Sequence, residues 1–370
     1  MSPNEFNRQG QHPRRTERQK PRFSWLPFVV FAIVIVVIAG SLPFFMSHEE
    51  NEPPVTLPKD KHTDVPASVT TALSDTTKIL DIIKLPELTK APETTASVDV
   101  EPTPFPVRTS ETVTVWSAIN SKYAILVDRS TGKVIAEKNA TSKMYPASMT
   151  KIMTLIVAYE HAYSLDDTFT MTEEIIAPLG PANASVAGFV IGETVTVRDM
   201  LYGAMLPSGA DATDGLAVHI AGSTENFVAL MNKKARELGL KGTHFVNASG
   251  LHDDNHYSTA EDIAIIFNYA LSIPECREIM TTRYYTATPT PEHPDGLRMG
   301  STVLAREFSV VGATVLGGKT GYTLEAHQCL ASLAVSKKGT ECILITGSAE
   351  TKTACTQDAN YMHTKYTAKQ

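Results

Sequence analysis

The sequence predicts an α/β (α+β) fold for residues 113–350, with a mixed, largely antiparallel sheet built from both ends of this domain and a helical lobe packed on it. Runs rich in β-branched residues lie near the start of the domain and again in its final third. The runs between them have the apolar spacing of helices. We therefore expect a cleft between the sheet and the lobe.

The expected sheet takes strands from two distant parts of the chain. Residues 123–128 and 134–137 form a hairpin, because both are β-rich and a turn that contains Gly132 joins them. The strands of the final third are separated by glycine-containing turns and lie at residues 314–316, 330–335 and 342–346.

Helices are expected between the two groups of strands. The first begins at Pro146, a residue suited to a first helical turn, and carries an apolar face as far as Val157. Ser258 and Glu261 have the spacing of a capping box at the start of the last one. The other helices are expected at residues 196–206, 211–220, 224–238 and 258–271.

Charge and cysteine content limit the function. The chain has 370 residues and a formal net charge of −7, so it has no general basic excess to neutralise phosphates, and we expect no nucleic-acid partner. Its cysteines match neither a C-x-x-C metal pattern nor a dense disulfide framework, and we expect free thiols. They are Cys276, Cys329, Cys342 and Cys355.

The N-terminal segment predicts export from the cytoplasm. Residues 1–22 are basic and are expected to stay in the cytoplasm. Residues 23–47 carry no charge and exceed the ~20 residues that an apolar helix needs to span a bilayer, so we expect a single-pass transmembrane signal-anchor. A cleaved signal peptide is the alternative, because Val37-Ile38-Ala39 resembles a cleavage site.

Two further segments flank the expected domain. Residues 48–112 are rich in Pro, Thr and charged residues, and such a composition predicts a disordered linker. Residues 351–370 follow the last expected strand and are expected to be a C-terminal tail.

Ser148 and Lys151 form the first candidate catalytic pair. They lie three residues apart at the start of a predicted helix, so the lysine amine can reach the serine oxygen. Unpaired N–H groups in a first helical turn offer an oxyanion site beside the serine, as acyl transfer requires. A second Ser-x-x-Lys, from Ser130 to Lys133, lies in a turn where no helix holds the pair together.

Two other segments offer matching chemistry. Lys319-Thr320-Gly321 lies on a predicted strand, where the lysine supplies a cation for a carboxylate and the glycine lets a ligand lie close. Ser208 presents a hydroxyl in the loop between two helices. The simpler interpretations are an exposed lysine at a strand end and a serine that caps the next helix.

The order Ser-x-x-Lys, serine-containing loop and Lys-Thr-Gly resembles the signature of penicillin-binding proteins and related β-lactamases. Residues 145–151, 247–251 and 257–262 resemble the low-molecular-mass D-alanyl-D-alanine carboxypeptidases in particular, over about residues 120–348. The resemblance implies a β-lactamase/transpeptidase-like fold with the active site in the cleft. It also implies a bacterial protein whose catalytic domain is extracellular.

The resemblance implies a catalytic role for three residues. Ser148 would attack the terminal D-Ala-D-Ala bond of a peptidoglycan stem peptide and form an acyl-enzyme. Lys151 would be the general base, and Ser208 would relay a proton to the leaving D-alanine. β-Lactam antibiotics would acylate the same serine, and neither a cofactor nor a metal is implied.

It also implies a substrate-binding set on one strand. Lys319 and Thr320 would hold the terminal carboxylate of the substrate, and Gly321 would let the substrate lie along the strand. The N–H group of Tyr322 would form the oxyanion hole together with that of Ser148.

Two departures from the family pattern concern the cleft. Ala210 stands where the family usually has an asparagine, whose amide contacts the catalytic lysine; Asp211 is a conceivable partial substitute. Residues 325–328, Glu-Ala-His-Gln, replace a common Ala-Gly after the Lys-Thr-Gly strand, so the rim of the cleft is expected to differ.

Three alternatives stay open from the sequence. Ala210 favours a catalytically impaired penicillin- or peptidoglycan-binding protein, and a β-lactamase would need rapid deacylation. A zinc carboxypeptidase would use His252 and His256, which lie four residues apart, but no His-Glu-x-x-His motif occurs in the chain.

Overall fold

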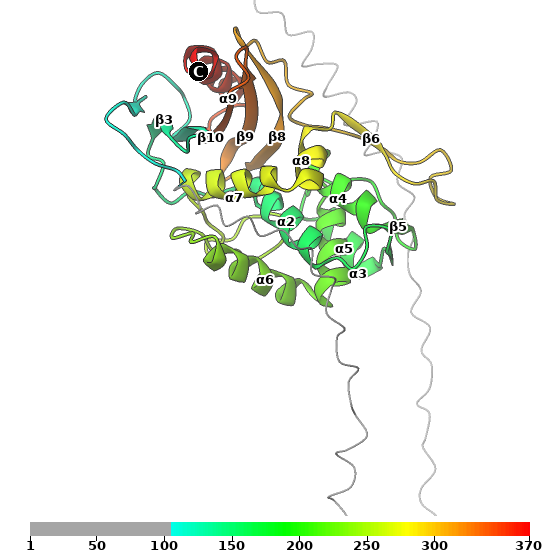
Figure 1. Ribbon diagram of the computed structural model, residues 1–370. Coiled ribbons are helices and arrows are strands. Elements are labelled where there is room, and N and C mark those ends of the chain that lie inside the picture. The colour runs from blue at the N-terminus through cyan, green and yellow to red at the C-terminus, as the bar shows by residue number, and fades with distance from the viewer. Residues whose placement is uncertain (1–104) are drawn as a thin grey trace, which may run out of the picture. The chain divides into compact units, whose positions relative to one another are not determined.

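The computed structural model describes residues 105–370 (Figure 1). The expected cytoplasmic segment 1–22, the expected anchor 23–47 and the linker up to residue 104 lie outside the described residues. Among the described helices, none combines the length and the apolar character that crossing a bilayer requires.

A six-stranded sheet with the order β1-β3-β2-β10-β9-β8 lies at the centre of the domain. Only β1 and β3 pair in parallel, and all other neighbours are antiparallel. Ile125 of β2 lies opposite Ile345 of β10, so strands from both ends of the domain are neighbours, as predicted. The strands are β1 (Val113–Thr114), β2 (Tyr123–Asp128), β3 (Val134–Lys138), β8 (Ala313–Thr323), β9 (His327–Ser336) and β10 (Glu341–Ala349).

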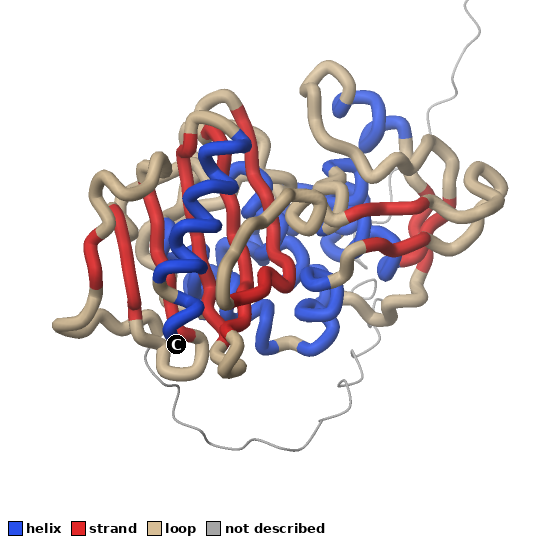
Figure 2. The backbone as a smooth tube through the Cα atoms, turned by 90° about the horizontal axis from the view of Figure 1, so that it is seen from above, coloured by secondary structure: helices blue, strands red, loops and turns tan. Residues whose placement is uncertain are grey.

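Alternate residues of the sheet face two separate hydrophobic cores. Ala124 and Leu126 belong to the core under helix α9 (Lys352–Lys365), whereas Ile125 and Val127 belong to the core shared with the helical lobe. This is the period of two that a strand buried on both faces requires. Figure 2 shows α9 lying along one face of the sheet. The domain therefore has three layers.

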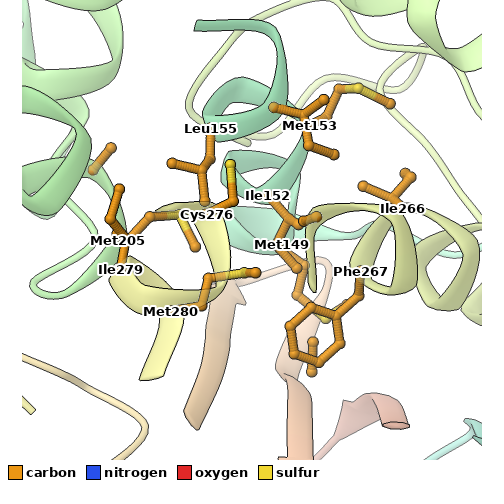
Figure 3. Close-up of a cluster of buried hydrophobic side chains, with 14 of the residues drawn as sticks. Met149, Ile152, Met153, Leu155, Met205, Ile266, Phe267, Cys276, Ile279 and Met280 are labelled. Atoms are coloured by element: carbon orange, nitrogen blue, oxygen red, sulfur yellow. The ribbon is translucent and has the colours of Figure 1, made fainter. Parts of the chain in front are cut away.

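The helical lobe surrounds the helix that follows Ser148. This helix, α2 (Lys151–His161), is buried at every position from Lys151 to Ala158. Figure 3 shows side chains of α2 and of the turn before it among those of α7 and α8. The surrounding helices are α4 (Val197–Met205), α5 (Ala210–Ala221), α6 (Thr224–Glu237), α7 (Ala260–Ser272) and α8 (Pro274–Thr281).

The four central helices expected from the sequence agree with α4, α5, α6 and α7 to within two residues at each end. The cap of α7 differs, because the Thr259 hydroxyl accepts the Asp262 N–H, whereas Ser258 bonds the Thr243 hydroxyl. Short elements gave too few apolar repeats to be predicted. They are β4 (Thr168–Thr170), α3 (Glu173–Ile176), η2 (Ala177–Leu179), β5 (Thr194–Thr196), β6 (Tyr284–Thr286) and β7 (Arg298–Gly300).

Both expected flanks of the domain are corrected. Residues 351–370 are not a tail, because α9 and the turn η3 (Thr367–Lys369) cover the sheet, and Asp358 accepts the N–H groups of Asn120 and Ser121. The end of the expected linker belongs to the domain as well, since the Val107 N–H donates to Gly132 O at 2.8 Å. A short linker end without apolar periodicity gave no signal of this packing.

The four cysteines are buried and free, as predicted. They lie on four different elements, namely α8, β9, β10 and α9.

Candidate active site

Ser148 lies in the turn η1 (Ala147–Thr150), and Lys151 is the first residue of α2. The Lys151 Nζ donates to Ser148 Oγ at 3.2 Å and to Ser249 O at 2.5 Å. Lys151 is 2% exposed. The helix start therefore brings the predicted pair together, although its first turn is a 3₁₀ turn.

Two backbone features fix the position of this turn. Ala147 has a left-handed φ of 47°. Gly250 lies so close that a Cβ on it would stand 2.0 Å from Ala147 O, and a Cβ on Gly321 would stand 2.9 Å from Pro146 O. Only glycine permits such close approach, so the serine is held from two sides.

Ser208 lies between α4 and α5 and faces the Lys-Thr-Gly strand. The Lys319 Nζ donates to Ser208 Oγ at 2.8 Å and to Thr320 O at 3.0 Å. Lys319 is fully buried. The simpler interpretation, an exposed lysine at a strand end, therefore does not hold.

A cavity of about 280 Å³ joins the two pairs. Its lining includes Ser148, Lys151, Ser208, Thr320, Gly321 and Tyr322. Lys319 is not in the lining and reaches the site through Ser208. The cleft expected between sheet and lobe is thus present, and six of the seven predicted site residues line it.

The electrostatics of the cleft favour neutral amines. Burial lowers the pKa of Lys151 to about 8, and Asp214 and then Asp211 oppose this shift. Burial lowers the pKa of Lys319 well below its usual range, and the charges of Lys151 and Arg306 act in the same direction. A lysine that loses its proton near neutral pH can act as a base.

Several residues of the cleft were not predicted. Thr302 Oγ1 lies 2.8 Å from Thr320 Oγ1 and aligns the strand hydroxyl. Arg306 lines the cavity, is 8% exposed, donates to Thr356 Oγ1 at 3.0 Å and leaves its Nε without a partner among the described residues. Both residues lie in an irregular loop, where spacing carries no signal.

Asp211 does not take the place of the missing amide. Its carboxylate accepts the N–H groups of Ala187, Gly188 and Phe189 at 2.7, 2.9 and 3.2 Å. Asp211 therefore holds the loop that borders the cavity, and the expectation that it substitutes for an asparagine at position 210 is not supported.

His256, one of the two residues considered for zinc, has both ring nitrogens engaged. Its Nδ1 accepts the Val246 N–H at 3.2 Å, so Nε2 carries the proton and donates to Thr150 Oγ1 at 2.7 Å. Burial lowers the pKa of His256 to about 4. Within residues 105–370, no group of three His, Cys, Asp or Glu side chains is arranged to hold a metal ion.

A three-layer fold with a buried Ser/Lys pair facing a second Ser/Lys pair defines the penicillin-binding class of serine acyl-transfer proteins. The chain belongs to the D-alanyl-D-alanine carboxypeptidase family, peptidase S11, whose model matches residues 108–351. The family predicted from the motifs is confirmed.

Curated relatives agree with this membership. The chain is 39% identical over 245 residues to D-alanyl-D-alanine carboxypeptidase DacF of Bacillus subtilis, which covers 63% of this chain and 57% of the relative. It is 33% identical over 231 residues to DacC of Escherichia coli, covering 55% of this chain and 58% of the relative. The chain thus spans less than two thirds of the length of these relatives.

Solved structures confirm the predicted fold class. The DD-transpeptidase of Streptomyces K15 has a TM-score of 0.60 at 30% identity, covering 66% of this chain and 96% of that chain. Penicillin-binding protein 5 of Haemophilus influenzae has a TM-score of 0.58 at 27% identity, covering 66% of this chain and 70% of that chain.

Proposed function

We propose that this protein is a serine-type D-Ala-D-Ala carboxypeptidase that removes the terminal D-alanine from peptidoglycan stem peptides. The observation that carries the proposal is the Lys151 amine, buried, with a pKa of about 8 and 3.2 Å from Ser148 Oγ. At pH 7 about one lysine in ten is neutral at such a pKa, which suffices for a base.

Acylation uses both Ser/Lys pairs. Lys151 takes the Ser148 proton while Ser148 Oγ attacks the carbonyl of the penultimate D-alanine, and the N–H groups of Ser148 and Tyr322 stabilise the oxyanion. Ser208 then relays this proton from Lys151 to the leaving nitrogen as the C–N bond breaks, so Lys151 is neutral again before deacylation. Its 2.8 Å hydrogen bond from Lys319 supports this relay.

Deacylation reverses the proton path. A water molecule attacks the ester, Lys151 takes its proton, and that proton returns to Ser148 Oγ as the C–O bond breaks. The shortened peptide leaves, and the enzyme is restored. A β-lactam acylates Ser148 by the same attack, but its ring-opened leaving group stays attached.

The substrate carboxylate is assigned to the strand side of the cavity. Thr320 supplies a hydroxyl aligned by Thr302, Arg306 supplies positive charge, and Lys319, whose pKa is lowered by burial, supplies an N–H donor to Ser208. Gly321 lets the peptide lie against β8. Arg306 extends the predicted set, because a buried guanidinium beside the cavity attracts an anion.

The location of the protein follows from the part of the sequence outside the described residues. Residues 1–22 would lie in the cytoplasm, residues 23–47 would cross the bacterial membrane, and the residues up to 104 would link the helix to an extracellular domain. Extracellular peptidoglycan is the substrate that this location makes available.

The decisive experiment is D-alanine release from a diacylated Lys-D-Ala-D-Ala peptide by the full chain. We expect release by the wild type and none by Ser148→Ala. Ser130→Ala is the matched control, because Ser130 belongs to the other Ser-x-x-Lys and its hydroxyl bonds Asp128. Equal release by Ser148→Ala would refute the proposal.

A penicillin-binding protein with impaired turnover is the second candidate, and Ala210 favours it, because it provides no amide beside Lys151. Labelling of Ser148 by a fluorescent penicillin without D-alanine release would support it, and release regained by Ala210→Asn would identify the cause. Many turnovers of a chromogenic β-lactam would instead support a β-lactamase.

A further inference from the structure

Asp214 lies one helical turn from the cavity and has no role in the mechanism above. It follows Ala210 by four residues on α5, so the two side chains share a helix face. Ala210 lines the cavity together with Ser148 and Lys151. α5 packs against α2, which begins with Lys151 (Figure 1). A carboxyl group therefore lies on the same face of α5 as Ala210, which offers the catalytic pair no polar atom.

Lys151 has one donor left for an electrostatic partner. An ammonium group carries three N–H bonds, and within residues 105–370 its Nζ donates only to Ser249 O and Ser148 Oγ. No carboxylate of the described residues lies within 4.0 Å of it, the limit for a salt bridge. The lysine charge is thus balanced by charges at longer range.

Asp214 and Asp211 differ in what holds them. The Asp211 carboxylate accepts N–H groups from Ala187, Gly188 and Phe189, which spread its charge over the loop. Within residues 105–370 the Asp214 carboxylate makes no hydrogen bond, and the residue is half-buried. A half-buried carboxylate that accepts no N–H group keeps its charge on its own oxygens and acts on the nearest cation.

The two charges affect each other. Burial raises the pKa of Asp214 to about 6, Lys151 opposes the shift, and Asp211 adds to it. Of the two carboxylates that raise the pKa of Lys151 against its burial, Asp214 is the stronger. The charge of Lys151 in turn lowers the pKa of Lys319 on β8 and of His256.

We propose that Asp214 is a positioning residue that holds Lys151 in its ammonium form and thereby sets the lower pH limit of acylation. The inference rests on the proposed function, since Asp214 acts only through the base. Between about pH 6 and 8 the carboxylate is ionised and the lysine is protonated, so the pair titrates as a unit. Removing the negative charge makes the ammonium less stable, and the lysine then becomes neutral at lower pH.

The test is the rate at which a fluorescent penicillin acylates the full chain between pH 5.5 and 9.5. We expect Asp214→Asn to shift the pH at which the acylation rate is half-maximal down by about half to one pH unit. The acylation rate at pH 6.5 should rise about 3- to 10-fold. Asp166→Asn is the matched control, because it removes the same charge from a side chain that is 83% exposed and pairs with Arg198. A faster acylation of Asp214→Asn at pH 6.5 cannot result from damage to the fold, because such damage would slow acylation.

An unchanged or higher midpoint in Asp214→Asn would overturn the inference. A second readout separates this failure from that of the proposed function, namely the NMR titration of the Lys151 Cε in the ligand-free protein, assigned with Lys151→Arg. If penicillin does not label the wild type, the proposed function fails, and the lysine titration still tests Asp214. If the wild type is labelled and the lysine titration is the same in Asp214→Asn, the inference alone fails.

Discussion

At the scale of single residues, the nucleophile is positioned by glycines that its own motif does not contain. Gly250 approaches the peptide before Ser148 from one side, and Gly321 approaches it from the strand. The catalytic turn therefore depends on two segments distant in sequence. Substitutions at these glycines should displace Ser148 without contacting its side chain.

Gly250→Ala should lower both stability and acylation. The new Cβ would stand 2.0 Å from Ala147 O at a φ of 81°, so the turn must move. We expect a loss of more than about 2 kcal/mol in the free energy of unfolding and at least a tenfold slower penicillin acylation. Urea denaturation and labelling kinetics measure the two effects.

Gly222→Ala is the control for this change. Gly222 has a similar φ of 76°, but a Cβ there would meet nothing within 4 Å. Only the left-handed backbone should matter, at about 1 kcal/mol, with unchanged acylation. Equal effects of the two substitutions would show that the contact with Ala147 has no part in holding the serine.

Lys151→Arg should remove the base while retaining the charge. A guanidinium stays protonated at every pH at which the protein is folded, so it cannot accept the Ser148 proton. We expect penicillin acylation to fall by about 10²-fold or more, with no recovery at high pH. A rate that still rises between pH 7 and 9 would assign the base to another group.

The sequence predicted the Ser148/Lys151 pair more directly than the Ser208/Lys319 pair, and the reason is their separation along the chain. Ser148 and Lys151 lie on one helical turn, so spacing alone brought them together. Ser208 and Lys319 are 111 residues apart, and only the resemblance to a family grouped them with the first pair. Arg306 in the cleft and Asp214 one helical turn from it carry no motif, because their positions depend on tertiary packing.

At the scale of elements, α9 is a structural helix with a buried histidine in its last turn. His363 lies between Ser332 Oγ and Thr367 Oγ1, each 3.0 Å from a ring nitrogen. Burial lowers the pKa of His363 to about 3. The imidazole is therefore neutral in the folded protein.

This burial predicts acid sensitivity. Below pH 6.5 the His363 imidazole is protonated in the unfolded chain but stays neutral in the folded protein. The free energy of unfolding therefore falls as the pH decreases from about 6.5 towards 3. At pH 4.5 the loss from this residue is on the order of 2–3 kcal/mol. Urea denaturation at pH 7.5 and 4.5 should show a smaller difference for His363→Gln.

His161→Gln provides the comparison, because His161 is exposed at the end of α2. It should keep the pH dependence of the wild type. If His363→Gln does so too, the acid sensitivity arises from other groups, of which His256 is the first to test.

Whether a helix or strand could be predicted from the sequence depended on its length and on how regular its apolar pattern is. The long helices and strands were found because they repeat a buried face several times. Three-residue strands such as β4 and β6 do not, and α9 buries mostly small or polar residues, among them Cys355, Ala359 and Asp358. Their formation depends on neighbours that the sequence does not display.

At the scale of the whole molecule, the sheet is closed by the last part of the chain. A chain ending at residue 350 lacks α9, which covers one face of the sheet. We expect such a chain to be unfolded, because that face would expose its apolar side chains to water. Circular dichroism and penicillin labelling test this, and labelling at the wild-type rate would contradict it.

The pairing of β2 with β10 also determines when the domain can fold during synthesis. Strand β2 and the turn that carries Ser148 leave the ribosome long before β10, the strand that pairs with β2, has been made. This is because β10 begins only at Glu341. The nascent domain therefore stays incomplete and open to proteases until β10 has been translated. A premature stop codon just before Glu341 should consequently be as damaging as one at the start of the domain.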